Sequence, residues 1–309
     1  MNRNLKKIVF ITAAVAVVSL GLAAILFFAT NVGRAWGLKG GIPVDERRTF
    51  FVEGIGDISI RTGSTDVFVG KNEGSSVEIH LYGTVYSAQP EAIPALNAEQ
   101  NGGLLTITTG RKDGRPFVLG FFSSDLILEI RIPERYRDAL LVHTSSGDVE
   151  IDDQQLSKLS VETSSGDIQL RSIQAGTITL GSSSGDQRVE NLLAEHSELT
   201  SSSGEIRVKG LEGGAKAESS SGDITLHYQV FNSDLEVRSS SGDVGLFLTE
   251  TAEFRLEARA SSGDVDCAFP VTLAEASGEV RRNRLRGIVG DGTHQVVVQT
   301  SSGDITIRP

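Results

Sequence analysis

Cysteine, aromatic residues and basic residues are all scarce in this sequence, and each scarcity excludes a class of protein. One cysteine, Cys267, cannot form an internal disulfide framework. Aromatic residues make up 6% of the chain, and 40 acidic residues outnumber 29 basic ones, giving a net charge of −11. An acidic, aromatic-poor surface argues against nucleic acid, and against an anionic membrane face, as the main partner.

Charge is missing altogether from residues 8–29, a run of 22 residues that is long enough to cross a bilayer as a helix. We expect a retained transmembrane helix there, with residues 1–7 in the cytoplasm, because Arg3, Lys6 and Lys7 precede the run. A cleaved signal peptide is the alternative, although its apolar core is usually shorter. Either interpretation exports the remainder, whose charge from Lys39 onward is −15.

A tetrapeptide, Ser-Ser-Gly-Asp, recurs eight times between Ser145 and Asp304, with Glu205 in place of one aspartate. Its glycines are Gly147, Gly166, Gly185, Gly204, Gly222, Gly242, Gly263 and Gly303. The first seven lie 18 to 21 residues apart and the last gap is 40, which we interpret as two periods with one copy missing. A fixed period near 20 indicates one short unit stacked many times.

Apolar and polar residues alternate on both sides of each motif, as they do in half-buried strands. Val161 and Thr163 precede Gly166, for example, and Ile168 and Leu170 follow it. Because these positions recur from copy to copy, we predict rungs stacked in register as parallel strands. The expected fold is an all-β solenoid, resembling a parallel β-helix, with rungs of roughly 20 residues.

Each position of the motif has a predicted structural role. The glycine is expected at a corner that needs positive φ or a close backbone approach, and the aspartate is expected to accept a hydrogen bond from a nearby turn amide. Extending the alternation predicts that the serine just before each glycine points inward. These serines are Ser146, Ser165, Ser184, Ser203, Ser221, Ser241, Ser262 and Ser302.

The predicted organisation after the helix has three parts. Residues 30–48 are rich in glycine and are expected to form a linker. Residues 49–140 are expected to form degenerate N-terminal rungs with insertions at 87–103 and 110–124, and residues 141–309 the regular solenoid. Residues 54–60 repeat the Gly-Asp-apolar-x-apolar half of the later motif. Phe117, Phe121 and Phe122 are expected to cover the open end, with a partner or lipid contact as the alternative.

Catalysis and metal binding are not expected. The five histidines occupy different phases of the repeat, so no serine has a recurring base beside it. The acidic column is evenly spread, as a structural device would be, and capping of turns is favoured over calcium binding. Cys267 is expected to be a core thiol, because Leu170, Leu226 and Leu246 occupy the same repeat position. No cofactor is predicted.

One basic patch stands out in this acidic chain. Arg281, Arg282, Arg284 and Arg286 lie within six residues and are candidates for contact with an anionic polymer such as a wall phosphate or a uronate. A solvated loop that balances neighbouring acids is the alternative.

The repeats resemble the bacterial DUF4097 family, whose members are described as putative adhesins. The Ser-Ser-Gly-Asp copies carry the likeness, together with the entry segment from Phe50 to Val69 and Ile130-Arg131-Ile132-Pro133. The resemblance implies a β-solenoid at the bacterial cell surface, often behind one membrane helix, and it supplies no catalytic residues.

We therefore expect a membrane-anchored, extracytoplasmic binding or scaffold module that is not an enzyme. Residues 8–29 would contact the membrane, and a surface glycan, a wall polymer or an envelope protein would be the partner. An accessory protein of a cell-envelope stress system is the alternative function, and a carbohydrate-active enzyme is a weaker one.

Overall fold

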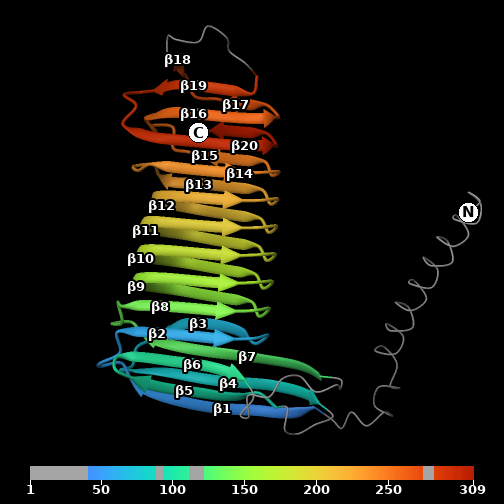
Figure 1. Cartoon of the computed structure of the whole chain (residues 1–309). Helices are drawn as coiled ribbons and strands as arrows, with labels where there is room; N and C mark the ends of the chain where they lie inside the picture. Colours follow the sequence, from blue (N-terminus) through green and yellow to red (C-terminus); the bar gives the residue numbers. More distant parts are fainter. Residues whose placement is uncertain (1–40, 88–92, 111–121, 274–281) are drawn as a thin grey trace, which may run out of the picture.

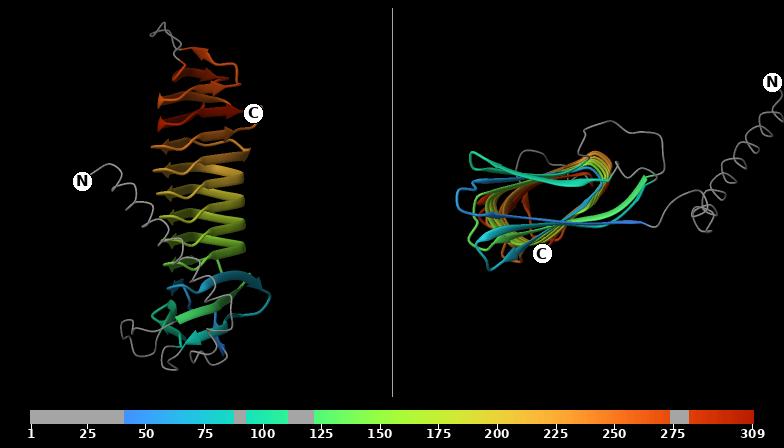
Figure 2. Two further views of the ribbon diagram at one scale, coloured as in Figure 1. Left: turned by 90° about the vertical axis from the view of Figure 1, so that its right-hand side faces the viewer. Right: turned by 90° about the horizontal axis from the view of Figure 1, so that it is seen from below.

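The computed structural model describes residues 41–87, 93–110, 122–273 and 282–309, and every regular element in these ranges is a β-strand. The strands stack into a long column (Figure 1), and the rungs superpose when the column is viewed along its axis (Figure 2). The all-β prediction is confirmed. Within the described ranges no helix is long and apolar enough to span a bilayer, and the helix expected at 8–29 lies outside them.

The described part of the chain contains 21 strands. They are β1 (Ile42–Phe51), β2 (Asp57–Thr62), β3 (Asp66–Asn72), β4 (Ser76–Ser87), β5 (Ala95–Asn101), β6 (Leu104–Gly110), β7 (Phe122–Pro133), β8 (Ala139–Thr144), β9 (Val149–Thr163), β10 (Ile168–Ser182), β11 (Gln187–Ser201), β12 (Ile206–Ser219), β13 (Ile224–Val230), β14 (Leu235–Ser239), β15 (Val244–Phe247), β16 (Phe254–Ser262), β17 (Val265–Cys267), β18 (Thr272–Leu273), β19 (Arg284–Val289), β20 (His294–Ser302) and β21 (Ile305–Arg308).

Four long strands, β9 to β12, form the regular centre of the column. Each pairs with the next in parallel and in register, so that Ile168 lies between Val149 and Gln187. Residues at the same position in successive rungs therefore form columns along the axis. Alternate columns are buried, and one of them contains Ile151, Leu170 and Val189. Each fully buried apolar side chain of this size contributes roughly 1.5–3 kcal/mol to stability.

A second corner, which no sequence motif marks, follows the first half of each of these rungs. Asp153, Ser172 and Asn191 have φ values of 54°, 55° and 58°, and Gly210 in the next rung has a φ of 71°. These residues form one column in the left-handed region. Aspartate, asparagine and glycine visit this region most readily, so the composition of the column matches its geometry.

Serine is the least suited of the four residues to this conformation, and we expect Ser172→Gly to stabilise the protein. Glycine adopts positive φ without steric cost, whereas other residues pay about 1 kcal/mol or more. The free energy of unfolding, measured by urea denaturation, should therefore rise by about 1 kcal/mol. Gly210→Ser is the reciprocal control and should lower it. A lower stability for Ser172→Gly would contradict the strained-corner interpretation.

The prediction that the serine before each glycine points inward is wrong. Those residues are exposed in every copy, because the alternation stops where the chain bends at the first serine of the motif. The exposed residues are Ser146, Ser165, Ser184, Ser203, Ser221, Ser241, Ser262 and Ser302. The buried hydroxyl column lies three residues before the glycine instead. It comprises Thr144, Thr163, Ser182, Ser201, Ser219, Ser239 and Thr300.

These buried hydroxyls hold the corner through hydrogen bonds to its backbone. In some rungs the glycine amide donates to the hydroxyl, as Gly166 N does to Thr163 Oγ1 at 2.9 Å. In others the hydroxyl donates to the glycine carbonyl, as Ser201 Oγ does to Gly204 O at 2.8 Å. A hydroxyl can serve both purposes because it is both a donor and an acceptor.

We expect Ser201→Ala to lower the free energy of unfolding by about 1 kcal/mol, because it removes this buried hydrogen bond. Ser202→Ala and Ser203→Ala change exposed side chains and should stay within about 0.5 kcal/mol of the wild type. Denaturant unfolding of the three variants is the measurement. Equal effects at Ser201 and Ser203 would contradict the assignment of the buried column.

The last two copies of the motif are not stacked in chain order. β20 pairs in parallel with β14 on one side and with β16 on the other. Likewise, β21 lies between β15 and β17. The final copy is therefore inserted between the rungs of Gly242 and Gly263 (Figure 1). The expectation of two stacked periods with one copy missing is wrong, because the chain runs outward through β16 to β19 and then returns.

The N-terminal region has the same interleaved arrangement. β2 lies between β6 and β8, and β3 lies between β7 and β9. The alignment of residues 54–60 with the half of the repeat that follows each motif glycine is wrong by half a rung. Ile58 lies opposite Leu140, ahead of the corner, and the matching corner is 62–66, whose Thr62 lies opposite Thr144.

Two predicted boundaries also change. The expected linker 30–48 overlaps β1, which begins at Ile42, and the expected insertion 87–103 contains β5. Both strands run antiparallel to a neighbour, β1 to β4 and β5 to β6. At the opposite end β19 pairs antiparallel with β16. Antiparallel strands thus close both ends, while Phe117 and Phe121 lie outside the described residues.

Candidate functional site

The motif aspartates form a hydrogen-bonded ladder along one edge of the column. The Asp167 amide donates to Asp148 Oδ1 at 2.8 Å, and the Asp186 amide donates to Asp167 Oδ1 at 2.9 Å. The partner is therefore the amide of the next rung, not an amide of the same turn as predicted. The ladder follows the interleaved order, since the Asp304 amide donates to Asp243 Oδ1 and the Asp264 amide to Asp304 Oδ1.

Among the described residues the ladder has one gap, at the copy that carries glutamate. The Glu205 amide donates to Asp186 Oδ1 at 2.9 Å, but no such bond joins the Asp223 amide to the Glu205 carboxylate. That carboxylate bonds Arg207 instead. The extra methylene of glutamate moves the carboxylate away from the amide of the next rung.

We expect Glu205→Asp to close this gap and to raise the free energy of unfolding by about 1 kcal/mol, the usual net contribution of a hydrogen bond. Asp223→Glu is the matched control, since it lengthens the carboxylate that accepts the Asp243 amide at 2.9 Å. It should lower stability by a similar amount. Chemical denaturation measures both, and a stabilising Asp223→Glu would contradict the ladder.

The ladder is a structural device in which the carboxylates are already engaged. Arg188 pairs with Asp167 Oδ2 at 3.0 Å and with Asp186 Oδ2 at 2.6 Å, and the bond with Asp167 raises the pKa of Arg188. Asp66, which precedes the motif copies, begins the ladder by accepting the Asp148 amide at Oδ1 at 2.9 Å, and burial raises its pKa. Within the described ranges no group of three or more histidine, cysteine or acidic side chains is placed to hold a metal ion.

The motif glycines lie where the backbones of successive rungs approach most closely. A Cβ built on Gly166 would come within 3.0 Å of the carbonyl oxygen of Gly147, a distance that real Cβ atoms essentially never show. The same overlap occurs in each full copy, and the φ of Gly204 is not in the left-handed region. Close approach is therefore the requirement shared by the whole column, while positive φ is limited to Gly263 and Gly303, whose φ values are both 156°.

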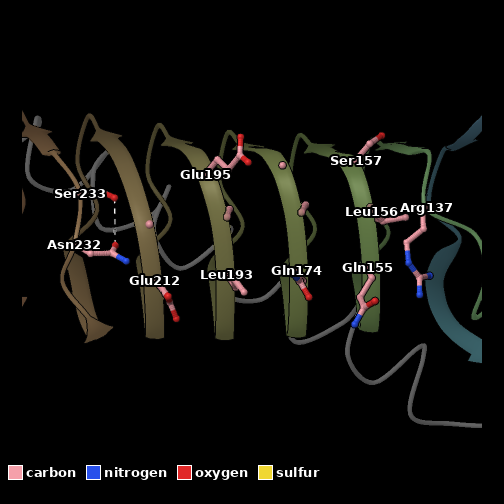
Figure 3. Close-up of a pocket in the computed structure, with 14 residues that line it drawn as sticks. Arg137, Gln155, Leu156, Ser157, Gln174, Leu193, Glu195, Glu212, Asn232 and Ser233 are labelled. Carbon is pink, nitrogen blue, oxygen red and sulfur yellow. Dashed lines mark hydrogen bonds between the residues drawn. The ribbon is translucent and has the colours of Figure 1, made fainter.

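A groove of about 590 Å³ runs across successive rungs on another side of the column (Figure 3). Its floor is a column of buried residues whose size falls along the groove, from Leu156 through Ala175 and Ala194 to Gly213. We call it the small-residue groove. The groove is concave because the alanines have only a methyl group, and Gly213 has no side chain, to fill the space between the two rims.

The rims of the small-residue groove are mainly polar. Gln155, Gln174, Leu193 and Glu212 project from one rim, and Glu195 lies on the other (Figure 3). Arg137 lies at one end of the groove. The amides of Gln155 and Gln174 lie on neighbouring rungs and can both donate and accept hydrogen bonds, while the Glu212 carboxylate can accept them. This arrangement suits an extended, hydrogen-bonding ligand better than a compact apolar one.

The predicted arginine patch is partly described. Arg286 pairs with Glu257 at 3.2 Å, and Arg284 lies opposite Arg259 in the antiparallel pair of β16 and β19. Arg282 is exposed, and Arg281 lies outside the described residues. Arg281 to Arg286 are close along the chain, whereas Arg259 joins them only through the pairing of β16 with β19 and could not be found from sequence spacing.

Cys267 occupies the column predicted for it, since it lies opposite Ile307, which in turn lies opposite Leu246. It is only half-buried, because among the described strands β17 pairs with β21 alone. Burial nevertheless raises the pKa of the thiol, which lowers the thiolate fraction and hence its reactivity.

The histidines lie in separate environments. His80 Nε2 is 2.8 Å from Asp45 Oδ1, and this hydrogen bond lowers the pKa of Asp45. His227 stacks on Phe247 with ring centroids 4.1 Å apart. In the part of the chain that the structure describes, no histidine is hydrogen-bonded to a serine hydroxyl, so no Ser-His pair of a catalytic triad is assembled there.

The fold and its grooves define an all-β solenoid with long polar surfaces. The chain belongs to the DUF4097 family, whose model, described as Toastrack DUF4097, matches residues 55–308. The resemblance inferred from the repeats is thereby confirmed.

Several solved structures are similar in outline. A putative adhesin from Bacteroides fragilis is 14% identical, with a TM-score of 0.47 over 86% of this chain and 97% of its own. A putative lipid binding protein from Parabacteroides distasonis is 15% identical, with a TM-score of 0.41 over 85% and 96%. A putative cell adhesion protein from Clostridium sporogenes is 12% identical, with a TM-score of 0.33 over 86% and 99%. No curated protein matches the sequence.

Proposed function

We propose that this protein is a non-enzymatic binding module held on the outer side of a bacterial cell membrane by a helix at residues 8–29. The observation that carries the proposal is the small-residue groove, which crosses successive rungs and places Gln155, Gln174 and Glu212 along one rim, with Leu193 between the last two. Such a surface can bind an extended polymer through many weak contacts, each on its own rung. The acidic exterior supports solubility outside the cell.

The anchoring part of the proposal rests on the uncharged run and the basic residues before it. The mature protein should keep residues 1–29 and sediment with membranes, while protease added to intact cells or spheroplasts should cleave the domain from residue 41 onward. N-terminal sequencing gives the test. A mature chain that begins near residue 30 would show a cleaved signal peptide, and protection of the domain from external protease would place it inside the cell.

The binding part is tested by cross-linking on intact cells with the full chain as bait. We expect cross-links from the small-residue groove to an envelope polymer, with Gln174 and Gln155 as attachment points for a photoreactive residue. Photoreactive residues at Lys158 and Thr177, which do not line the groove, are the matched controls. Specific cross-links to a single membrane protein would instead identify an accessory of an envelope regulatory system.

A carbohydrate-active enzyme is the second candidate, because Glu195 and Glu212 place two carboxylates in the same groove. Glycoside hydrolysis requires such a pair. The proposal of a binding module predicts no release of reducing sugar from envelope glycans by the wild type. Release that disappears in Glu195→Gln or Glu212→Gln would establish the enzyme instead.

A further inference from the structure

A second groove, of about 640 Å³, lies along the serine corner in the C-terminal third of the column. We call it the serine-corner groove. Among the residues that line it are Arg238, Arg259, Gln299, Ser240, Ser261 and Ser301. They come from β14 and the corner that follows it, from β20 and from β16, three strands that the interleaved topology places side by side (Figure 1).

Part of one column of outward-facing residues along this groove is cationic, next to Glu218, which lies opposite Arg238 and also lines the groove. Arg238 lies opposite Gln299, Gln299 lies opposite Arg259, and Arg259 lies opposite Arg284 of β19. Neighbouring strands are roughly 4.8 Å apart, so the first two arginines are separated by roughly 10 Å and the last two by roughly 5 Å. A row of three guanidinium groups is unusual in a chain with a net charge of −11.

The arginines of this column differ in their partners. Arg238 is neutralised by Glu218 at 3.2 Å and by Glu236. Arg259, by contrast, has no acidic partner within 4.0 Å among the described residues, and it is exposed. The nearest acid on its own strand, Glu257, pairs with Arg286 at 3.2 Å. The positive charge of the groove is therefore concentrated around Arg259.

Neutral hydrogen-bonding groups surround that charge. Exposed hydroxyls are presented on three neighbouring rungs by Ser240, Ser261 and Ser301. Within the described ranges, none of these three hydroxyls forms a hydrogen bond with another protein group. The Gln299 amide lies between Arg238 and Arg259. Hydroxyl and amide groups can both donate and accept hydrogen bonds, so they match the hydroxyls of a sugar.

We infer that the serine-corner groove binds a linear polysaccharide that carries uronate carboxylates. Arginine forms bidentate hydrogen bonds with carboxylates. The serine and glutamine groups both donate and accept hydrogen bonds, and a sugar hydroxyl can use both capacities, whereas a bare polyanion only accepts. The hydroxyl and amide groups extend over several rungs while the unneutralised charge lies around Arg259, so the groove fits a chain that combines carboxylates with sugar hydroxyls better than one small anion. The inference rests on the proposed function, to which it adds a ligand class.

The test measures binding of the full chain, in detergent, to fluorescent oligomers of galacturonate, mannuronate and glucuronate. A neutral maltooligosaccharide of the same length and inorganic polyphosphate are the comparison ligands. We expect saturable binding of at least one uronate oligomer and weaker binding of both comparison ligands. Failure of all three uronates, or equal binding of the neutral sugar or of polyphosphate, would overturn the inference.

Arg259→Gln is the decisive variant, and Arg255→Gln is its control. Both residues are exposed on β16, and both changes remove one positive charge, but Arg255 does not line the groove. We expect Arg259→Gln to weaken uronate binding by roughly tenfold, as the loss of a hydrogen bond to a charged group should. Arg255→Gln should change it less than roughly twofold.

The thermal unfolding midpoint of each variant shows whether folding is intact, since both side chains are exposed. Equal weakening by both substitutions would indicate general charge attraction and would overturn the site. The proposed function is tested separately by the cross-linking experiment. An envelope polymer cross-linked to the small-residue groove, together with an Arg259→Gln variant that binds normally, would refute this inference alone.

Discussion

Gly204→Ala is expected to lower the free energy of unfolding by about 3 kcal/mol, an unusually large effect for the addition of one methyl group. The new Cβ would come within 3.0 Å of the Gly185 carbonyl oxygen and would lie 3.1 Å from the Asp186 amide nitrogen. Both atoms are backbone atoms of the neighbouring rung, so neither can move without separating the strands. Overpacking of a rigid site typically costs about 1–3 kcal/mol, and here it also breaks pairing between rungs.

Gly181→Ala is the matched control, because Gly181 belongs to the adjacent rung and lies in a strand. Its added Cβ would meet only side-chain atoms, at 3.5 and 3.8 Å, which are ordinary contacts. Alanine should therefore be neutral or slightly stabilising there. Urea unfolding of both variants gives the comparison. If Gly204→Ala proves as stable as Gly181→Ala, then rung spacing does not explain why the motif contains glycine.

The sequence was sufficient to predict the rungs, because alternation and a fixed period are local signals. Val149, Ile168 and Ile206 occupy one buried column as their spacing predicts. The error in the serine column arose at the corner, where alternation no longer reports which way a side chain points. Thr163 is buried and Ser165 is exposed because the chain bends between them.

The order of the rungs could not be predicted, because a repeat shows which residues are equivalent but not which copies are neighbours. The rung that follows that of Gly242 along the column is the rung of Gly303, 61 residues further along the chain. The rung of Gly263, which is closer to Gly242 in the sequence, comes after it. The same limit concealed the arginine column, since Arg238 and Arg259 meet only through Gln299 of the inserted strand. The left-handed corner was missed because Asp153, Ser172, Asn191 and Gly210 share a conformation but no common residue type.

The inserted C-terminal strands make a strong prediction about truncation. Removal of residues 292–309 should detach β16 to β19 from the column, because among the described strands only β20 and β21 join β14 and β15 to β16 and β17. Four buried core residues would also be lost, Val296, Val298, Ile305 and Ile307, each contributing roughly 1.5–3 kcal/mol. In a solenoid stacked in chain order, removal of the last rung would cost a single interface.

Hydrogen exchange measured strand by strand is the appropriate test. In the truncated protein we expect amides of β16 and β19 to lose protection while those of β9 to β12 retain it, because rungs interact mainly with their neighbours.

The full-length variant Val298→Ala tests the same connection between β14 and β16 without deleting part of the chain. Val298 is fully buried between Val237 and Ala258, and its truncation should reduce protection on both sides, in β14 and in β16. Arg308→Gln, which removes only an exposed pair with Asp266 at 2.6 Å, should leave both strands protected. Full protection of β16 and β19 in the truncated protein would show that the C-terminal strands lie at the end of the column and not within it.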